Sequence, residues 1–115
     1  MIREVTIDGI QYKLAPYNYA KHIEISDRST RIDVDERTRT ARTSTLVGTV
    51  RMLELLYSIK SWTFRGVDAD GNLKTEGDVL AITEANLKLL PAKHGKHLQD
   101  LAGEVNSPTD EEVKN

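Results

Sequence analysis

The sequence contains no cysteine, and only one tryptophan and one phenylalanine, in 115 residues. Without cysteine the chain has no disulfide, no thiolate ligand for zinc and no thiol nucleophile. No apolar run approaches the roughly 20 residues that a helix needs to cross a bilayer, so no membrane partner is expected. The first five residues lack the apolar stretch of a secretory signal. These absences favour a protein of a reducing or redox-indifferent compartment.

A large excess of charge of one sign is also missing. Sixteen basic and eighteen acidic residues give a formal net charge of −2, which excludes a strongly basic, histone-like chain. Hydrophobic residues make up 38% and charged residues 30% of the sequence, which is typical of a small soluble domain with a lean core. We expect one α+β domain over residues 1–106, followed by a polar acidic tail over residues 107–115.

The first fourteen residues carry the clearest local pattern. Apolar residues alternate with polar ones on both sides of Asp8-Gly9, namely Val5, Ile7, Ile10, Tyr12 and Leu14. Asp-Gly suits a two-residue type I′ turn, because both central residues need positive φ. Folding there pairs Ile7 with Ile10 on one face. The other face then sets Glu4 opposite Lys13, a favourable charge pair. The pattern predicts an N-terminal β-hairpin.

The segment after the hairpin is less distinctive. Pro16 fits the first turn of a helix, where its missing N–H is not needed. Tyr17, Ala20 and Ile23 then form one side of a short helix that ends near Ser26. The alternation of isoleucines in this segment fits a strand equally well, and both interpretations stay open.

Residues 26–45 change in character. Three of them are apolar, namely Ile32, Val34 and Ala41. So few apolar side chains do not repay the entropy of ordering the chain. Loops of about twenty residues are usually functional or disordered. We therefore predict a mobile connector within the domain.

Residues 46–62 are the most apolar part of the chain, with ten apolar side chains among seventeen. Ser44 or Thr45 is expected to cap the start of a helix here. Its polar residues recur at helical spacing in a narrow stripe, so the helix must be covered on more than one side. Two interpretations stay open. The helix is the core of this domain, or part of it faces another subunit or an apolar helix of a partner.

A second, shorter hairpin is predicted beyond this helix. Trp62, Phe64 and the neighbourhood of Val67 alternate as in a strand. The turn-forming residues 68–72 follow, and residues 79–82 are expected to return as a short strand.

Two helices are predicted at the end of the domain. Thr83 is a suitable N-cap for a helix that Pro91 interrupts. The last helix spans roughly residues 92–105 and carries one apolar face, formed by Leu98, Leu101, Ala102 and Val105. The helices and hairpins together indicate a mainly helical body around one apolar central helix.

Metal-ligating residue types occur twice, but neither arrangement is complete. A calcium loop starting at Asp68 would place Leu73 at the glycine position and Val79 at the bidentate glutamate position. His94 and His97 are three residues apart on the last helix. The leucines define the buried side of that helix, so both histidines are expected on or near its exposed side. We predict no metal and no cofactor.

Catalytic motifs are missing as well. The sequence has no Gly-x-Ser-x-Gly elbow and no glycine-rich phosphate loop. Its carboxylates lie on predicted turns, on the tail and on polar helix faces, where nothing prepares them for acid–base chemistry. We predict that the protein is not an enzyme.

Residues 37–42 form the one local basic cluster. Its arginines can contact phosphates, which need cations rather than a special geometry. No aromatic residue is interleaved to stack on bases, and acidic residues immediately precede the cluster. A solvated loop is therefore the favoured interpretation, and nucleic acid is a less favoured partner.

The second half of the chain resembles the tail assembly chaperones of long-tailed bacteriophages. The similarity rests on three segments: Leu-Leu-Tyr-Ser-Ile-Lys-Ser-Trp-Thr-Phe (55–64), Asp-Ala-Asp-Gly-Asn-Leu (68–73) and Ile-Thr-Glu-Ala-Asn-Leu-Lys-Leu-Leu-Pro (82–91). In that family, too, an apolar helix leads into a Trp-containing segment, an Asp-Gly turn and a Thr-capped helix ending in Leu-Pro. The resemblance covers about residues 46–115 and, more loosely, the first 25. The segment 74–78 is a longer insertion than the family pattern has.

The resemblance implies a non-enzymatic role in tail assembly. Such chaperones coat the long, apolar, helical tape-measure protein, keep it soluble and recruit tail-tube subunits. They act in the host cytoplasm and are absent from the finished virion. Many are made in two forms by a ribosomal frameshift, and the codons of Lys114-Asn115 can supply the run of adenines that such slippage uses.

A chaperone of this kind needs apolar surface that can hold an amphipathic helix. The residues predicted to bind the partner lie on the central helix and just after it: Leu46, Val50, Met52, Leu53, Tyr57 and Trp62. Self-association as a homo-oligomer is expected to screen this surface until the partner arrives. On this hypothesis, Leu53→Asp abolishes solubilisation of the partner.

Two other functions stay open. The chain is alternatively another small phage morphogenesis protein, such as a head–tail joining component that stays in the particle. Less favoured is a nucleic-acid-binding regulator that uses Arg37, Arg39 and Arg42.

Overall fold

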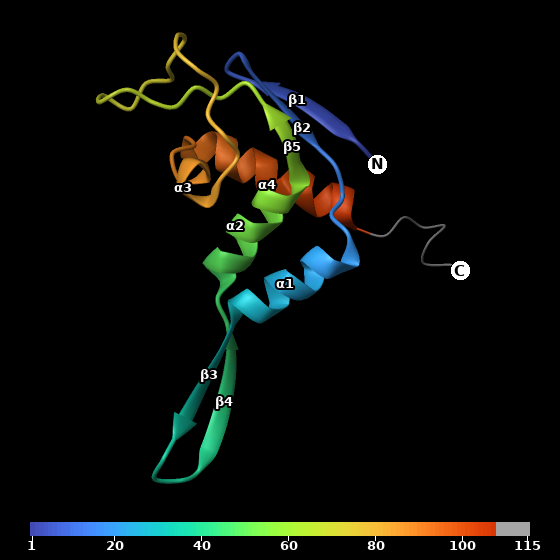
Figure 1. The fold of residues 1–115 in the computed structure, drawn as a ribbon, viewed down its shortest axis with the longest axis vertical. Coiled ribbons are helices and arrows are strands. Elements are labelled where there is room, and N and C mark those ends of the chain that lie inside the picture. The colour runs from blue at the N-terminus through green and yellow to red at the C-terminus, as the bar shows by residue number, and fades with distance from the viewer. Residues whose placement is uncertain (108–115) are drawn as a thin grey trace.

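A computed structural model describes residues 1–107 (Figure 1). Helices and strands both occur, which confirms the predicted α+β class. The predicted acidic tail falls, apart from its first residue, outside the described residues. The elements follow in the order β1 (Arg3–Ile7), β2 (Ile10–Leu14), α1 (Tyr19–Ser29), β3 (Thr30–Asp35), β4 (Thr40–Thr45), α2 (Val47–Ser58), β5 (Ile59–Trp62), α3 (Glu84–Leu87) and α4 (Ala92–Asn106).

The predicted N-terminal hairpin is confirmed with its register. Strands β1 and β2 are antiparallel, with Ile7 opposite Ile10 and Glu4 opposite Lys13. Asp8 and Gly9 have φ of 51° and 83°, as a type I′ turn requires. The local sequence alone therefore determines this element.

Strand β5 adds to the free edge of β2 and completes a three-stranded sheet in the order β1-β2-β5. Trp62 lies opposite Tyr12 and Ile59 opposite Leu14, with an irregularity between Lys13 and Leu14. The prediction of one helix through Trp62 was wrong, because the chain turns to extended geometry at Ile59. Pairing with β2 stabilises this strand, and such tertiary pairing overrides helix propensity.

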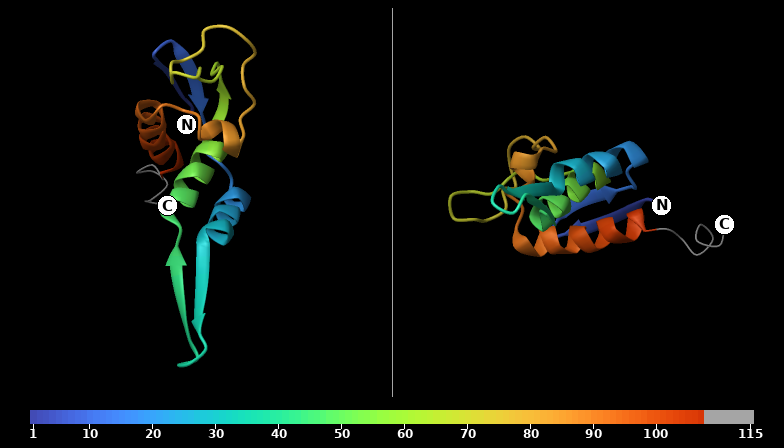
Figure 2. Two further views of the ribbon diagram at one scale, coloured as in Figure 1. Left: turned by 90° about the vertical axis from the view of Figure 1, so that its left-hand side faces the viewer. Right: turned by 90° about the horizontal axis from the view of Figure 1, so that it is seen from below.

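Helix α2 lies at the centre of the body, between α1 and α4 (Figure 2). It also contacts α3 and β5, while α4 packs against β1 and β2. The side chains buried among these elements form one core, made of Ile7, Ile10, Tyr12, Leu14, Leu55, Ile59, Trp62, Phe64, Leu87, Leu98, Ala102 and Val105. The expectation that α2 is covered on more than one side is confirmed.

Residues 30–45 form a second hairpin, called here the arm, which projects from the body (Figures 1 and 2). A mobile connector without regular structure was predicted at this place, and the structure differs. Apolar and charged residues alternate along β3, with Ile32 opposite Thr43 and Val34 opposite Ala41. At the turn, the Asp35 carboxylate accepts a hydrogen bond from the Arg37 amide. Counting apolar residues missed this alternation, which favours a strand.

The arm makes the molecule elongated. The principal extents are 56 × 44 × 21 Å. The radius of gyration is 17.2 Å, compared with about 13 Å for a compact chain of this length. None of the helices over residues 1–107 combines the length and the apolarity that a bilayer span requires.

Three predicted helix starts have different outcomes. Asn18 caps α1 by accepting from the Lys21 amide at 3.1 Å, so this helix begins after Pro16 rather than at it. Thr83 caps α3 as predicted. The predicted Ser44 or Thr45 cap of α2 was wrong. Both residues belong to β4, and Leu46, whose side chain cannot accept a hydrogen bond, takes the N-cap position.

The predicted second short hairpin was also wrong in part. Val67 and Leu73 form an isolated bridge around the predicted turn. Residues 79–82 run alongside the core without forming a strand. The Trp62 indole N–H donates to the Leu80 carbonyl at 2.7 Å, and the Leu80 amide donates to the Phe64 carbonyl at 2.9 Å. These bonds fix the long loop against β5.

The turn at Gly9 generates the first prediction. Gly9→Ala is expected to destabilise the protein by about 1 kcal/mol, because an added Cβ is strained at a φ of +83°. The matched control is Gly103→Ala inside α4, where the helical backbone accepts alanine and stability should rise by up to about 1 kcal/mol. Urea unfolding midpoints measure both. Equal effects of the two variants would contradict the assigned turn.

Candidate partner-binding surface

A chain of hydrogen bonds joins α4 to the N-terminal hairpin. His94 is fully buried, and its Nδ1 lies 2.7 Å from the Tyr12 hydroxyl. Its Nε2 lies 2.9 Å from a carboxylate oxygen of Asp8. A carboxylate only accepts, so Nε2 carries the proton and donates to Asp8, while Nδ1 accepts from the tyrosine hydroxyl. This arrangement satisfies both buried polar groups, as a packed interior requires.

The position of His94 corrects the prediction that both histidines lie on or near the exposed side of the helix. His94 shares one stripe with Leu98, Ala102 and Val105, all buried, whereas His97 is exposed. The spacing of four residues between His94 and Leu98 indicates that both side chains lie on the same face of the helix, and this signal would have predicted that His94 is buried. Within residues 1–107, no cluster of three or more metal-ligating side chains occurs.

Asp8, His94 and Tyr12 are hydrogen-bonded in the sequence carboxylate, imidazole, hydroxyl, as in a catalytic triad. The hydroxyl at the end of this series, however, is not accessible to solvent. The Tyr12 side chain is almost fully buried, so its hydroxyl has no route to a substrate. Burial also raises the pKa of this hydroxyl far above its ordinary value, which keeps it protonated. These contacts hold the turn of the sheet onto α4. That the protein is not an enzyme stays a prediction.

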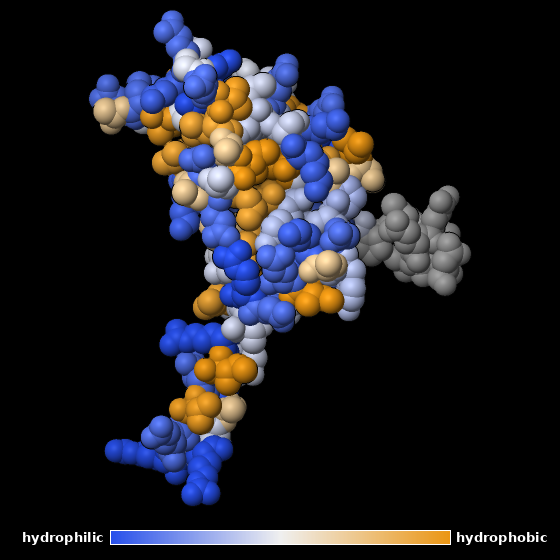
Figure 3. Space-filling view, in the orientation of Figure 1, coloured by the Kyte–Doolittle hydropathy of each residue, from blue (hydrophilic) through white to orange (hydrophobic). Residues whose placement is uncertain are grey.

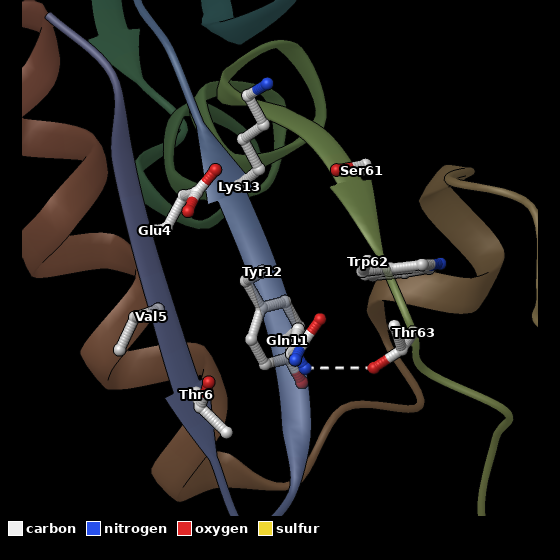
Figure 4. A pocket seen from close by; sticks show the side chains of 9 residues that line it. All are labelled: Glu4, Val5, Thr6, Gln11, Tyr12, Lys13, Ser61, Trp62 and Thr63. Carbon is white, nitrogen blue, oxygen red and sulfur yellow. Dashed lines mark hydrogen bonds between the residues drawn. The ribbon is translucent and has the colours of Figure 1, made fainter.

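The outer face of the sheet carries a shallow hollow of about 330 Å³ (Figure 4). Its polar side chains are exposed except for the half-buried Lys13, and they come from all three strands and the residue after β5: Glu4, Thr6, Gln11, Lys13, Ser61 and Thr63. Thr63 accepts a hydrogen bond from the Gln11 amide at 2.9 Å. Ligand sites are usually enclosed and mostly apolar, whereas this hollow is half open and is lined by polar and apolar residues alike.

Most exposed apolar side chains occur elsewhere, on α1, on the arm and at the start of α2. Ten large hydrophobic residues are exposed within residues 1–107, and six of them lie in the segment 19–47. These six, called here the apolar surface, are Tyr19, Ile23, Ile32, Val34, Leu46 and Val47. Hydrophobic side chains are visible along the arm in Figure 3. Their concentration in one segment of the chain marks that segment as the candidate interaction region.

The six residues predicted to bind the partner are divided by the structure. Leu53 has no exposed surface and Trp62 is 7% exposed, so both belong to the interior. Val50, Met52 and Tyr57 are half-buried. Leu46 alone of the six is exposed, at 40%. Most of the nominated helix therefore packs inside the domain, and Leu46 is the nominated residue that reaches the apolar surface.

Tyr57 is engaged in a polar cluster between α1 and α2. The Lys21 ammonium lies over its ring, 4.6 Å from the centroid, and pairs with Glu24 at 3.2 Å. A hydrogen bond with Tyr57, and then the bond with Lys21, lower the pKa of Glu24. Arg28 pairs with Glu84 of α3 at 2.6 Å. These contacts tie α1 to the body, so Tyr57 has a structural role.

Sequence reasoning missed most of the apolar surface. Ile32 and Val34 were judged too few to order a segment, and Val47 was counted among the apolar residues of the central helix without being predicted to bind a partner. The available signal was the spacing of two between Ile32 and Val34, which places both on one face of a strand. The arginines of the basic cluster lie near the outer end of the arm, where Arg37, Arg39 and Arg42 are all exposed.

The contact of Asp8 with His94 generates a pH prediction. The hydrogen bond from His94, and then that from Lys93, lower the pKa of Asp8 below its ordinary 3.8. A lowered carboxyl pKa stabilises the fold above pH 3.8, and this contribution is lost as the pH falls through the folded-state pKa. Asp8→Asn should therefore be less stable than the natural protein at pH 7. Because Asn also tolerates positive φ, the turn is kept.

The stability gap between the two proteins should narrow as the pH falls below 3.8, which urea unfolding at pH 7, 5 and 3 measures. Asp100→Asn, at an exposed carboxylate on α4, is the matched control. A gap for Asp8→Asn that stays constant over this range would contradict the assigned contact.

Comparison with known proteins assigns no family to this chain. No protein-family model, curated protein sequence or solved structure matches it. Its function is therefore inferred from its own residues and their arrangement, together with the sequence resemblance described above.

Proposed function

We propose that the chain is a phage tail assembly chaperone, which binds and solubilises the tape-measure protein and helps to recruit tail-tube subunits. The sequence resemblance of residues 46–115 supports this function. So does the exposed apolar surface on α1, the arm and the start of α2, which is the observation that carries the proposal. The protein would act in the host cytoplasm and leave before the virion is complete.

The apolar surface has the chemistry that a long amphipathic helix needs. Such a helix docks by laying its apolar stripe on exposed hydrophobic side chains. Ile32 and Val34 are about two-thirds exposed on one face of the arm, and Val47 is 56% exposed at its root. Binding a helix there removes these side chains from water, which is favourable in proportion to the area buried.

The arm also has a suitable length. Its six-residue strands span about 20 Å at roughly 3.3 Å per residue. A helix of about thirteen residues has the same length. One arm thus matches nearly four turns of a partner helix, and several copies of the chain along a tape-measure protein would cover it in steps.

Leu46→Asp separates binding from folding. Aspartate is a favoured N-cap residue, and Leu46 occupies the N-cap of α2 without a side chain able to accept. The cap contributes about 1 kcal/mol, and loss of the buried part of the Leu46 side chain, which is 40% exposed, costs about as much, so the stability of the variant should change little. It also places a charge on the apolar surface, so the soluble fraction of a co-expressed tape-measure protein should fall several-fold.

The control for this test is Leu53→Asp, which was first expected to act on the partner. Leu53 is fully buried, so its replacement by a charged residue should unfold the domain rather than remove a contact. A soluble fraction unchanged by Leu46→Asp would contradict the proposed surface. Finding the chain in purified virions by mass spectrometry would contradict a chaperone and favour a head–tail joining component.

The arm favours nucleic-acid binding as a second candidate function. A two-stranded β-ribbon fits the major groove of DNA, and this one carries Arg37 and Arg39 in its turn. Arg42 lies opposite Asp33, and further acidic residues flank the turn, which weakens attraction to phosphates. Nucleic-acid binding is therefore less favoured than the chaperone function.

Arg37→Ala/Arg39→Ala/Arg42→Ala tests the second candidate. If the arm binds DNA, the natural protein should bind a duplex at 50 mM salt, lose affinity steeply with added salt, and lose most of it in the triple variant. Fluorescence anisotropy measures this. No binding by the natural protein at low salt would exclude the function.

A further inference from the structure

The arm has little to stabilise it within one chain. All twelve strand residues are exposed. Its root is tied to the body by a hydrogen bond from the Leu46 amide to the Ser29 carbonyl at 2.7 Å. A two-stranded hairpin is marginally stable in water, whereas three or more strands with an apolar face hold together. Pairing with further strands would therefore stabilise the arm.

The outer edge of β3 is available for such pairing. Among residues 1–107, β3 pairs with β4 alone, so alternate main-chain N–H and C=O groups point away from the arm. An exposed strand edge of this kind is a template for another chain. The question is which strand complements it.

We propose that β3 pairs in antiparallel fashion with β3 of a second copy of this chain, about a two-fold axis at Ile32. In this register Ile32 lies opposite Ile32 of the second copy. Arg31 lies opposite Asp33 of the second copy, and the symmetry repeats this pair. Thr30 lies opposite Val34. Opposite charges thus face each other on both sides of the axis, with the two isoleucines between them, and the pairing covers residues 30–34 of the strand.

The neighbouring registers are unfavourable. An axis at Arg31 or at Asp33 sets that charged residue opposite itself. An axis at Val34 sets Asp33 opposite Asp35. Slips of a single residue place apolar side chains opposite charged ones, because the side-chain period of a strand is two. An axis at Asp33 would set Arg31 opposite Asp35 and Ile32 opposite Val34, but it leaves Asp33 opposite Asp33 at its centre. The axis at Ile32 is therefore the one that pairs opposite charges without setting like charges opposite each other.

The free edge of β4 does not offer the same match. Its single charged strand residue is Arg42, so an axis there pairs Arg42 with itself or with a neutral residue. Pairing at the β3 edge also brings a second positive charge to the Asp33 carboxylate. Asp33 already lies opposite Arg42 in the arm and 3.1 Å from Arg31. In the pair it would also face Arg31 of the second copy.

The product is a four-stranded sheet in the order β4-β3-β3-β4. One face would carry Ile32, Val34 and Ala41 from both copies, and the other would carry the charges. The pairing also lays the turn of each arm beside the root of the other. This inference does not depend on the proposed chaperone function, because it concerns the isolated protein.

The absence of cysteine allows a direct test of the register. In Ile32→Cys the two cysteines face each other on the axis, with Cα atoms about 4.5–5.5 Å apart, which a disulfide spans. In Val34→Cys the two cysteines are about four residues apart along the strands, or roughly 13 Å, and cannot join. The two sites are 66% and 65% exposed in the single chain, so they are matched in access.

Under mild oxidation Ile32→Cys should form a covalent dimer at least tenfold faster than Val34→Cys. Mixing Thr30→Cys with Val34→Cys should give a mixed disulfide, identified by peptide mass spectrometry, whereas each variant alone should give little. Light scattering should report a dimer for the natural protein at micromolar concentration. Equal cross-linking of Ile32→Cys and Val34→Cys, or a monomer at that concentration, would overturn the proposal.

Discussion

The structure depends on the packing of α2, which contacts α1, α3, α4 and β5. Because one helix contacts so many elements, most of its apolar side chains are buried or half-buried inside the domain, and Leu53 has no exposed surface. A small chain has few elements with which to build a core. The hydrophobic side chains that stay exposed therefore lie outside that core, and most of them are on α1, the arm and the first turn of α2.

A second set of contacts attaches the sheet to α4. His94 donates to Asp8 in the hairpin turn and accepts from Tyr12 in the middle of β2, so one buried side chain on α4 holds both the turn and the strand that follows it. Such a satisfied polar network inside a core is costly to disturb and specifies one arrangement. The arm is rooted elsewhere, between the end of α1 and the start of α2, and its strand residues are exposed.

Much of the fold could be predicted from the pattern of neighbouring residues in the sequence. Less of the candidate site could be predicted in this way. The Asp8-Gly9 hairpin and the Thr83 cap depend on neighbouring residues, and both were predicted. The exposure of Leu46 and the burial of Trp62 depend on what packs beside them, which spacing along one chain does not reveal. The arm lies between these cases, because the alternation of Ile32 and Val34 was present in the sequence but was outweighed by the low apolar content of the segment.

The sequence by itself determined the N-terminal hairpin, because positive φ at the turn, alternation and cross-strand charge all agree within fourteen residues. It also determined the apolar stripe of α4 through helical spacing. Only the tertiary structure decided that α2 ends at Ser58, since β5 gains its hydrogen bonds from β2, far away in the chain. It likewise decided that His94 is buried, because the partners that satisfy its two nitrogens lie more than eighty residues away.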